Sequence, residues 1–172
     1  VFVPGRTERQ RRRVGGAAAA PYNGAVMKIL SPAFDDQESI PARYTCDAGR
    51  VSPPLRFTGV PRAARSLVLI MDDIDVPRSN RPDGRWNHWL IWNMPPDTDG
   101  IAEGATPPGI SGHTTGGETG YQAPAPPQGE HRYVFRLYAL DTMLNLDFEK
   151  TRREDLLRAM DEHVIAEAEL TG

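Results

Sequence analysis

Cysteine is almost absent from this sequence. Cys46 is the only cysteine among 172 residues, so no disulfide can form within the chain. Disulfides are rare in reducing compartments, and a lone thiol therefore favours a cytoplasmic protein, although it does not exclude secretion. Long apolar runs are lacking too, because none approaches the roughly 20 residues that a membrane-spanning helix needs. We expect no transmembrane segment.

The chain also lacks an excess of either charge. Twenty Lys and Arg residues stand against 23 Asp and Glu residues, which gives a net charge of −3. Because nucleic-acid-binding domains normally carry a basic face, we expect no nucleic-acid partner. Glycine and proline are abundant, with 16 of each, and this favours a loop-rich, strand-based protein over a helical bundle.

Residues 1–25 differ in composition from the rest of the chain. Residues 6–13 contain five arginines, and residues 15–20 contain only glycine and alanine. A segment with so few large apolar side chains cannot bury enough surface to become ordered, so we expect a disordered N-terminal extension. An export signal is the alternative, but its apolar stretch would be short and interrupted by two glycines. We expect one domain over residues 26–172.

From residue 26 onward the pattern is that of a β protein. Apolar, β-branched and aromatic segments bounded by turn signals predict strands at residues 26–30, 66–71, 88–94 and 133–140. Residues 163–170 alternate between the two faces of a strand and predict a half-exposed closing strand. The long Pro- and Gly-rich stretch 95–130 is expected to be a functional or mobile loop.

One helix is clearly signalled near the C-terminus. Thr151 and Glu154 have the spacing of a capping box, and Leu156, Leu157 and Met160 follow as an apolar stripe. The fold class is therefore mainly β, an antiparallel sandwich or barrel with one clear helix.

Polar residues stand at three strand ends, each beside a turn rich in Pro or Gly. Asp73 and Asp75 follow the second predicted strand, His88 begins the third, and His131 precedes the fourth. If neighbouring strands pair antiparallel, these ends fall on the same rim of the sheet. We therefore expect Asp73, His88 and His131 to face one cavity.

Two histidines and a carboxylate are suited to binding an anion. Histidine N–H groups attract phosphate, and a neighbouring aspartate fixes the tautomer and favours the protonated ring. Purely structural interpretations exist for the same residues. A histidine at a strand end is often an interfacial residue with a solvated tip, and aspartates in turns often cap backbone N–H groups. Tryptophans such as Trp86 more often pack than stack on a ligand.

Several longer strings resemble one protein family. They are YTCDAGRVSPPLRF (residues 44–57), DDIDVP (72–77), WNHWLIWNMP (86–95) and GYQAPAPPQGEHRYVFRLYALD (120–141). Together they resemble the phosphatidylethanolamine-binding protein family, and most of all its bacterial and archaeal branch, often labelled Raf-kinase-inhibitor-like. The resemblance runs from about residue 27 to residue 172.

The resemblance implies a fold, a site and partners. The implied fold has two antiparallel sheets with Greek-key connections and one or two short helices. The implied ligand-binding residues are Asp73, Asp75, Pro77, Trp86, His88, Pro126, His131 and Tyr133, with Pro126 at the mouth of the pocket. Such proteins bind phosphate-like groups, phospholipid headgroups or nucleotides weakly. Some inhibit protein kinases or serine proteases, and members of this branch are often homodimers. The resemblance implies no cofactor and no metal.

The sequence departs from the family pattern at a few positions. Ile74 and Val76 replace a proline and a small alanine, and Ala123 stands where glycine is usual. Alanine does not adopt positive φ freely, and the Ala123 methyl group is expected to narrow the pocket.

A binding or regulatory module without chemistry is the leading interpretation. The alternative is an enzyme that uses the same histidines and aspartate as general acid and base on a small molecule. No activated serine or cysteine is visible, since no Gly-x-Ser-x-Gly elbow occurs. A third interpretation is a metal site, because two histidines and a carboxylate match a facial triad.

Overall fold

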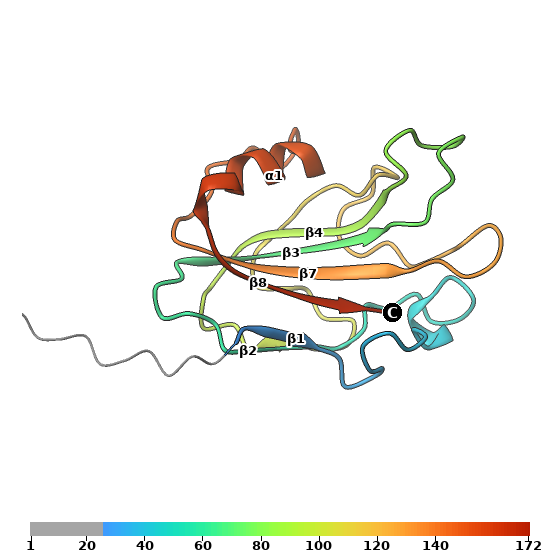
Figure 1. The fold of residues 1–172 in the computed structure, drawn as a ribbon, viewed down its shortest axis with the longest axis horizontal. Helices are drawn as coiled ribbons and strands as arrows, with labels where there is room; N and C mark the ends of the chain where they lie inside the picture. The colour runs from blue at the N-terminus through green and yellow to red at the C-terminus, as the bar shows by residue number, and fades with distance from the viewer. Residues whose placement is uncertain (1–25) are drawn as a thin grey trace, which may run out of the picture.

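The computed structural model describes residues 26–172, which form two antiparallel β-sheets and one α-helix (Figure 1). The small sheet has the order β1-β2-β5, formed by Lys28–Leu30, Leu55–Thr58 and Gly100–Ile101. The large sheet has the order β6-β4-β3-β7-β8, formed by Ile110–Ser111, Trp86–Met94, Ser66–Asp73, Tyr133–Leu140 and Val164–Thr171. The disordered extension predicted for residues 1–25 lies outside the described residues.

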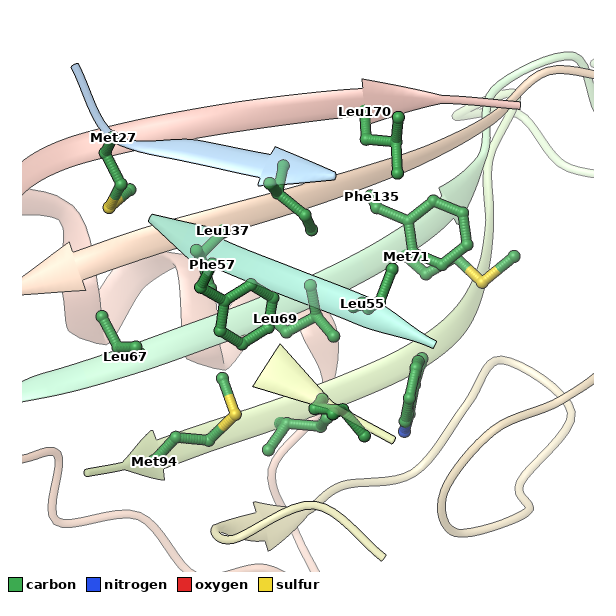
Figure 2. Packing of buried hydrophobic residues seen from close by; sticks show 14 of the residues in the cluster. Met27, Leu55, Phe57, Leu67, Leu69, Met71, Met94, Phe135, Leu137 and Leu170 are labelled. Atoms are coloured by element: carbon green, nitrogen blue, oxygen red, sulfur yellow. The ribbon is translucent and has the colours of Figure 1, made fainter. Parts of the chain in front are cut away.

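Strand β3 occupies the centre of the fold because it is apolar on both faces. All eight of its residues are buried. Leu67, Leu69 and Met71 pack toward the small sheet, while Val68 and Ile70 pack toward the helix. Figure 2 shows side chains of both sheets meeting in the first of these layers, among them Leu55, Phe57, Phe135 and Leu170, together with Met27, which precedes β1. A continuous apolar run is what a strand covered on both faces requires.

The helix, α1, spans Arg153–Met160 and covers the face of the large sheet opposite the small sheet (Figure 1). The predicted capping box was wrong by one residue. The N-cap is Arg152, and the Asp155 carboxylate accepts a hydrogen bond from the Arg152 N–H at 3.0 Å. Thr151 does not cap the helix, because its hydroxyl donates to the Asp147 carbonyl at 2.6 Å in the preceding turn.

Two short 3₁₀ turns, Ala42–Tyr44 and Asp161–His163, complete the helical structure of residues 26–172. Within this range no helix has the length and apolar character needed to cross a bilayer.

The pairing of β3 brings three strand ends together. β3 pairs antiparallel with both β4 and β7, and Asp73 lies opposite Trp86 on one side and Tyr133 on the other. β3 therefore ends where β4 and β7 begin, as the sequence predicted. The segments next to this end, residues 74–85 and 120–132, and the C-terminus lie at the same end of the molecule (Figure 1).

The connection from β4 to β7 is of the Greek-key type. After β4 the chain crosses to the small sheet as β5, returns as β6 at the edge of the large sheet, and then enters β7 beside β3. Neither β5 nor β6 was predicted, and β2 was also missed. At Gly100 a β-carbon would collide with the Leu55 carbonyl oxygen, so this two-residue strand depends on close backbone approach and not on β-forming side chains.

Candidate functional site

Consecutive residues at the end of β3 point to opposite faces of the large sheet. Asp72 faces the helix, where Arg153 donates to it from Nε and from a terminal nitrogen at 2.7–2.9 Å. Asn87 lies beside Asp72 and donates from Nδ2 to its Oδ1 at 3.1 Å. Asp73 and His88 face the other way, into a cavity. Successive side chains of a strand point to opposite faces of the sheet. Asp72 and Asn87 therefore lie on the helix side, and Asp73 and His88 lie on the side of the cavity.

We call this cavity the rim cavity. Its volume is about 530 Å³, within the range of small-molecule sites. Six of the predicted residues line it: Asp73, Pro77, Trp86, His88, His131 and Tyr133. The sequence did not single out the other lining residues as ligand-binding: Cys46, Arg50, Val76, Asn80, Arg81, Glu118, Tyr121, Gln122, Ala123, Ala125 and Pro127.

His131 and Asp73 form a nearly buried pair. Nδ1 of His131 lies 2.7 Å from Oδ2 of Asp73, and the side chains are 8% and 6% exposed. The other carboxylate oxygen accepts the Asp75 backbone N–H at 2.9 Å. Because an ionised carboxylate only accepts, Nδ1 of His131 carries the proton, and Nε2 is the ring atom left for a ligand.

His88 is oriented in the same way by a different acceptor. Its Nδ1 donates to the Gln122 carbonyl oxygen at 2.8 Å, which again leaves Nε2 for a ligand. Burial lowers the pKa of His88, and the bond to Gln122 opposes this only in part. The ring is therefore neutral near pH 7, and its Nε2 is an acceptor. Tyr133 meets the ring edge-on, with centroids 5.3 Å apart.

The Tyr133 hydroxyl has no hydrogen-bond partner among residues 26–172, although the atom is buried. Burial, and secondarily the charge of Asp73, raises the pKa of Tyr133, so the phenol keeps its proton and can donate it. An unpartnered buried donor beside a cavity is a position where a ligand acceptor would restore a lost hydrogen bond.

Gln122 is the residue that sequence reasoning missed most clearly. Its backbone N–H donates to the His88 carbonyl at 2.9 Å, and its side-chain Oε1 accepts from Trp86 Nε1 at 2.8 Å. Together with the bond to the His88 ring, these contacts fix the loop against the start of β4. Nothing in the local sequence marks this role, since it depends on the loop returning to β4.

Two arginines bring positive charge to the rim cavity. Arg81 is bonded to Asp83 through Nε and a terminal nitrogen at 3.2 and 3.1 Å. Arg50 lies in the left-handed region at φ 56°, where glycine is the less strained residue. Two carboxylates, those of Asp73 and Glu118, also line the cavity.

Asp75 and Pro126 do not line the rim cavity. Asp75 accepts bonds from the backbone N–H, Nε and a terminal nitrogen of Arg132 at 2.7–2.9 Å. Both Asp75 and Pro126 line a neighbouring hollow, which shares His131 and Tyr133 with the rim cavity. The pairing with Arg132 turns Asp75 outward and clamps the turn after β3 to the segment before β7.

Ala123 lines the rim cavity without the backbone strain expected for an alanine at a position where glycine is usual. It is not among the described residues with positive φ, so its methyl group is accommodated in an ordinary backbone conformation. Of the other two departures, Val76 lines the cavity, while the Ile74 backbone N–H donates to the Arg132 carbonyl at 3.2 Å. Among residues 26–172 no group of three His, Cys, Asp or Glu residues is arranged to hold a metal ion.

The Asp75–Arg132 clamp predicts a pH dependence of stability. The Arg132 hydrogen bonds lower the pKa of Asp75 from 3.8 to about 2. A lowered pKa in the folded state stabilises the protein above pH 3.8 and loses this effect as the pH falls toward 2. After allowance for solvent screening, Asp75→Asn should cost about 1 kcal/mol at pH 7.

Urea unfolding at pH 7 and near pH 2 would measure this difference. The two proteins should differ at pH 7 and approach one another near pH 2, because Asp75 becomes protonated there in the unaltered protein and loses its stabilising charge, while the amide of the variant does not titrate. A difference that is the same at both pH values would contradict the role of the clamp.

Comparison with known proteins gives a consistent result. Residues 30–172 match the family model described as phosphatidylethanolamine-binding protein. A UPF0098 protein of Chlamydia trachomatis is 49% identical over 146 residues, covering 85% of this chain and 97% of that protein. A UPF0098 protein of Methanothermobacter thermautotrophicus is 47% identical over 152 residues, covering 85% and 97%.

Solved structures share the fold. A crystal structure of a phosphatidylethanolamine-binding protein homologue from Chlamydia trachomatis has a TM-score of 0.82 and 48% identity, covering 86% of this chain and 95% of that one. Escherichia coli YbcL, described as a new member of the mammalian family, has a TM-score of 0.76 and 25% identity, covering 86% and 96%.

Proposed function

Because this chain belongs to the phosphatidylethanolamine-binding protein family, in the branch of the bacterial and archaeal UPF0098 proteins, we propose that it binds the phosphate group of a small ligand in the rim cavity. The protein acts as a binding or regulatory module and carries out no chemistry on that ligand.

One observation carries this proposal. Both histidines of the rim cavity have Nδ1 bonded within the protein, His131 to Asp73 and His88 to the Gln122 carbonyl. Each ring is therefore fixed in orientation, with Nε2 as the atom left for a ligand. Rings that are held in place lose little conformational freedom when a ligand binds.

The charges and hydrogen-bonding groups around the two rings suit a phosphate that carries one proton. The neutral His88 ring accepts the P–OH hydrogen at Nε2, and the Tyr133 hydroxyl donates to a phosphate oxygen. Arg50 and Arg81 supply positive charge at the cavity wall. The apolar wall of Trp86, Tyr121 and Pro127 would accommodate an organic substituent.

A histidine variant tests the proposal. The chain has four histidines, so each ring can be followed by NMR during a titration with inorganic phosphate. In the unaltered protein the His88 and His131 signals should shift with saturation at millimolar phosphate. His131→Asn should weaken the phosphate affinity obtained from the His88 shift about tenfold, because the hydrogen bond between His131 Nε2 and the phosphate is lost.

His163→Asn is the matched control. His163 also pairs with an aspartate, since its Nδ1 lies 2.9 Å from Asp141 Oδ1, but this pair is exposed and lies outside the rim cavity. The control should bind phosphate as the unaltered protein does. No saturable shift of His88 and His131 in the unaltered protein would refute the proposal.

Finer features belong to the same proposal. They are a regulatory role toward a protein kinase or serine protease, assembly as a homodimer, and a cytoplasmic location. The phosphate titration does not test any of these three features.

A further inference from the structure

A second cavity lies on the opposite face of the large sheet, at the start of α1. Its volume is about 420 Å³. We call it the helix-side cavity, and it is lined by Arg81, Asn87, His113, Thr114, Thr115, Gly116, Gly117, Arg152, Arg153 and Glu154. Of these, only Arg81 also lines the rim cavity. The proposed phosphate site makes no use of the other nine residues.

Two buried polar side-chain atoms of residues that line this cavity have no hydrogen-bond partner within residues 26–172. Thr114 and Asn87 are each 2% exposed, yet Thr114 Oγ1 and Asn87 Oδ1 form no hydrogen bond within residues 26–172. The orientation of the Asn87 amide is fixed, because Nδ2 donates to the Met71 carbonyl and to Asp72 Oδ1, both at 3.1 Å. Oδ1 is therefore an acceptor without a donor. Buried polar groups in folded proteins rarely lack partners.

Three arginines, Arg81, Arg152 and Arg153, and one carboxylate, that of Glu154, line the helix-side cavity. Arg81 is also paired with Asp83. Arg153 uses Nε and one terminal nitrogen on Asp72, and Arg152 uses one terminal nitrogen on the Glu149 carbonyl. Each guanidinium therefore keeps further N–H groups for a ligand. The start of α1 adds backbone N–H groups that have no partner within the helix.

We propose that the helix-side cavity is a second binding site, for a small phosphate or phosphomonoester. The guanidinium groups and the Thr114 hydroxyl donate to the anionic oxygens, and Asn87 Oδ1 accepts a hydrogen from the P–OH or from a hydroxyl of the ligand. The two unpartnered groups are thus one donor and one acceptor, matched to a ligand that is both anionic and hydroxylated. This site shares Arg81 with the rim cavity, but it does not rest on the function proposed for the rim cavity.

His113 reports on the helix-side cavity separately from the rim cavity. Its Nδ1 is 3.2 Å from the Gly117 carbonyl oxygen, and its ring stacks on Phe148. We would titrate the full chain with inorganic phosphate and, separately, with glycerol 3-phosphate at constant pH and ionic strength. The His113 ring signals should shift with saturation for at least one of them. A response to phosphate alone identifies the free anion, and a stronger response to the ester identifies a phosphomonoester.

Two variants test the contacts. Thr114→Val removes a hydroxyl that has no protein partner among residues 26–172, so it should leave the unfolding midpoint unchanged. The ligand affinity obtained from the His113 shift should fall about tenfold, because a hydrogen bond to the ligand is lost. Arg152→Gln should lower the same ligand affinity by a similar factor, because a charged hydrogen-bond donor is lost. His131→Asn is the control from the rim cavity and should leave the His113 response unchanged.

The outcomes separate the two sites. Absence of a saturable His113 shift with both ligands, or unchanged affinity in both Thr114→Val and Arg152→Gln, would overturn the second site. If His88 and His131 responded while His113 did not, the rim-cavity proposal would stand and this one would fall. The reverse pattern would leave only the helix-side cavity.

Discussion

Asp72→Asn should lower the free energy of unfolding by about 3–5 kcal/mol, since removal of one charge from a buried ion cluster leaves its partners uncompensated. Asp72 is fully buried and is bonded to Arg153 at 2.7–2.9 Å. Terminal nitrogens of Arg85 and Arg136 lie 3.8 and 3.7 Å from the same carboxylate. Asp72 is thus the carboxylate that three guanidinium groups share, and Arg136 has a second carboxylate partner in Glu169. Urea unfolding followed by tryptophan fluorescence would measure the loss.

Glu169→Gln is the matched control for Asp72→Asn. Glu169 also pairs with Arg136, at 2.9 Å, but it is exposed on β8. Exposed ion pairs typically contribute up to about 1 kcal/mol, so this control should remain close to the unaltered protein. We infer that the ion pairs of Asp72 hold α1 against the large sheet. A loss of unfolding free energy for Asp72→Asn no larger than that of the control would contradict this inference.

Phe135→Ala should destabilise the protein by a similar amount, about 3–5 kcal/mol, because it removes a large side chain from a packed core. Phe135 is fully buried on β7, between the two sheets (Figure 2). Phe34 packs against it with ring centroids 6.1 Å apart. The substitution would leave a cavity between β7 and the small sheet, and thermal or urea unfolding would record the loss of stability.

Phe148→Ala is the control for Phe135→Ala. Phe148 is 47% exposed and contacts His113 on the surface. Surface truncations of this kind usually change stability by less than about 1 kcal/mol. Equal losses of unfolding free energy in the two variants would mean that side-chain packing between the sheets does not stabilise the fold.

Long apolar strands were predictable because their periodicity is a property of the local sequence. The prediction at residues 133–140 coincides with β7, and the one at 66–71 extends by only two residues to Asp73. The short strands β2, β5 and β6 were missed, because two to four residues carry too little periodicity, whereas the equally short β1 lies inside the longer apolar segment predicted at residues 26–30. Their existence is decided by pairing with strands distant in sequence.

The candidate site was predictable to the extent that it lies at strand ends. Asp73, His88 and His131 converge because β3 pairs antiparallel with both neighbours. Residues contributed by loops, such as Gln122 and Arg50, could not be identified from their neighbours in the sequence. Their positions depend on contacts that only the folded chain creates, and the same is true of Asp75, which pairs with Arg132.

The alternation at the end of β3 has a consequence for changes in chain length. Asp72 and Asp73 serve opposite faces, so deletion of one residue within β3 would turn the remaining side chains over and exchange the two carboxylates. The contacts of Asp72 with Arg85, Arg136 and Arg153 and the lining of the rim cavity would be lost together. Insertions in the exposed turn at residues 78–80 would leave both carboxylates in place. Related proteins should therefore differ in length in this turn and keep β3 and β4 free of gaps.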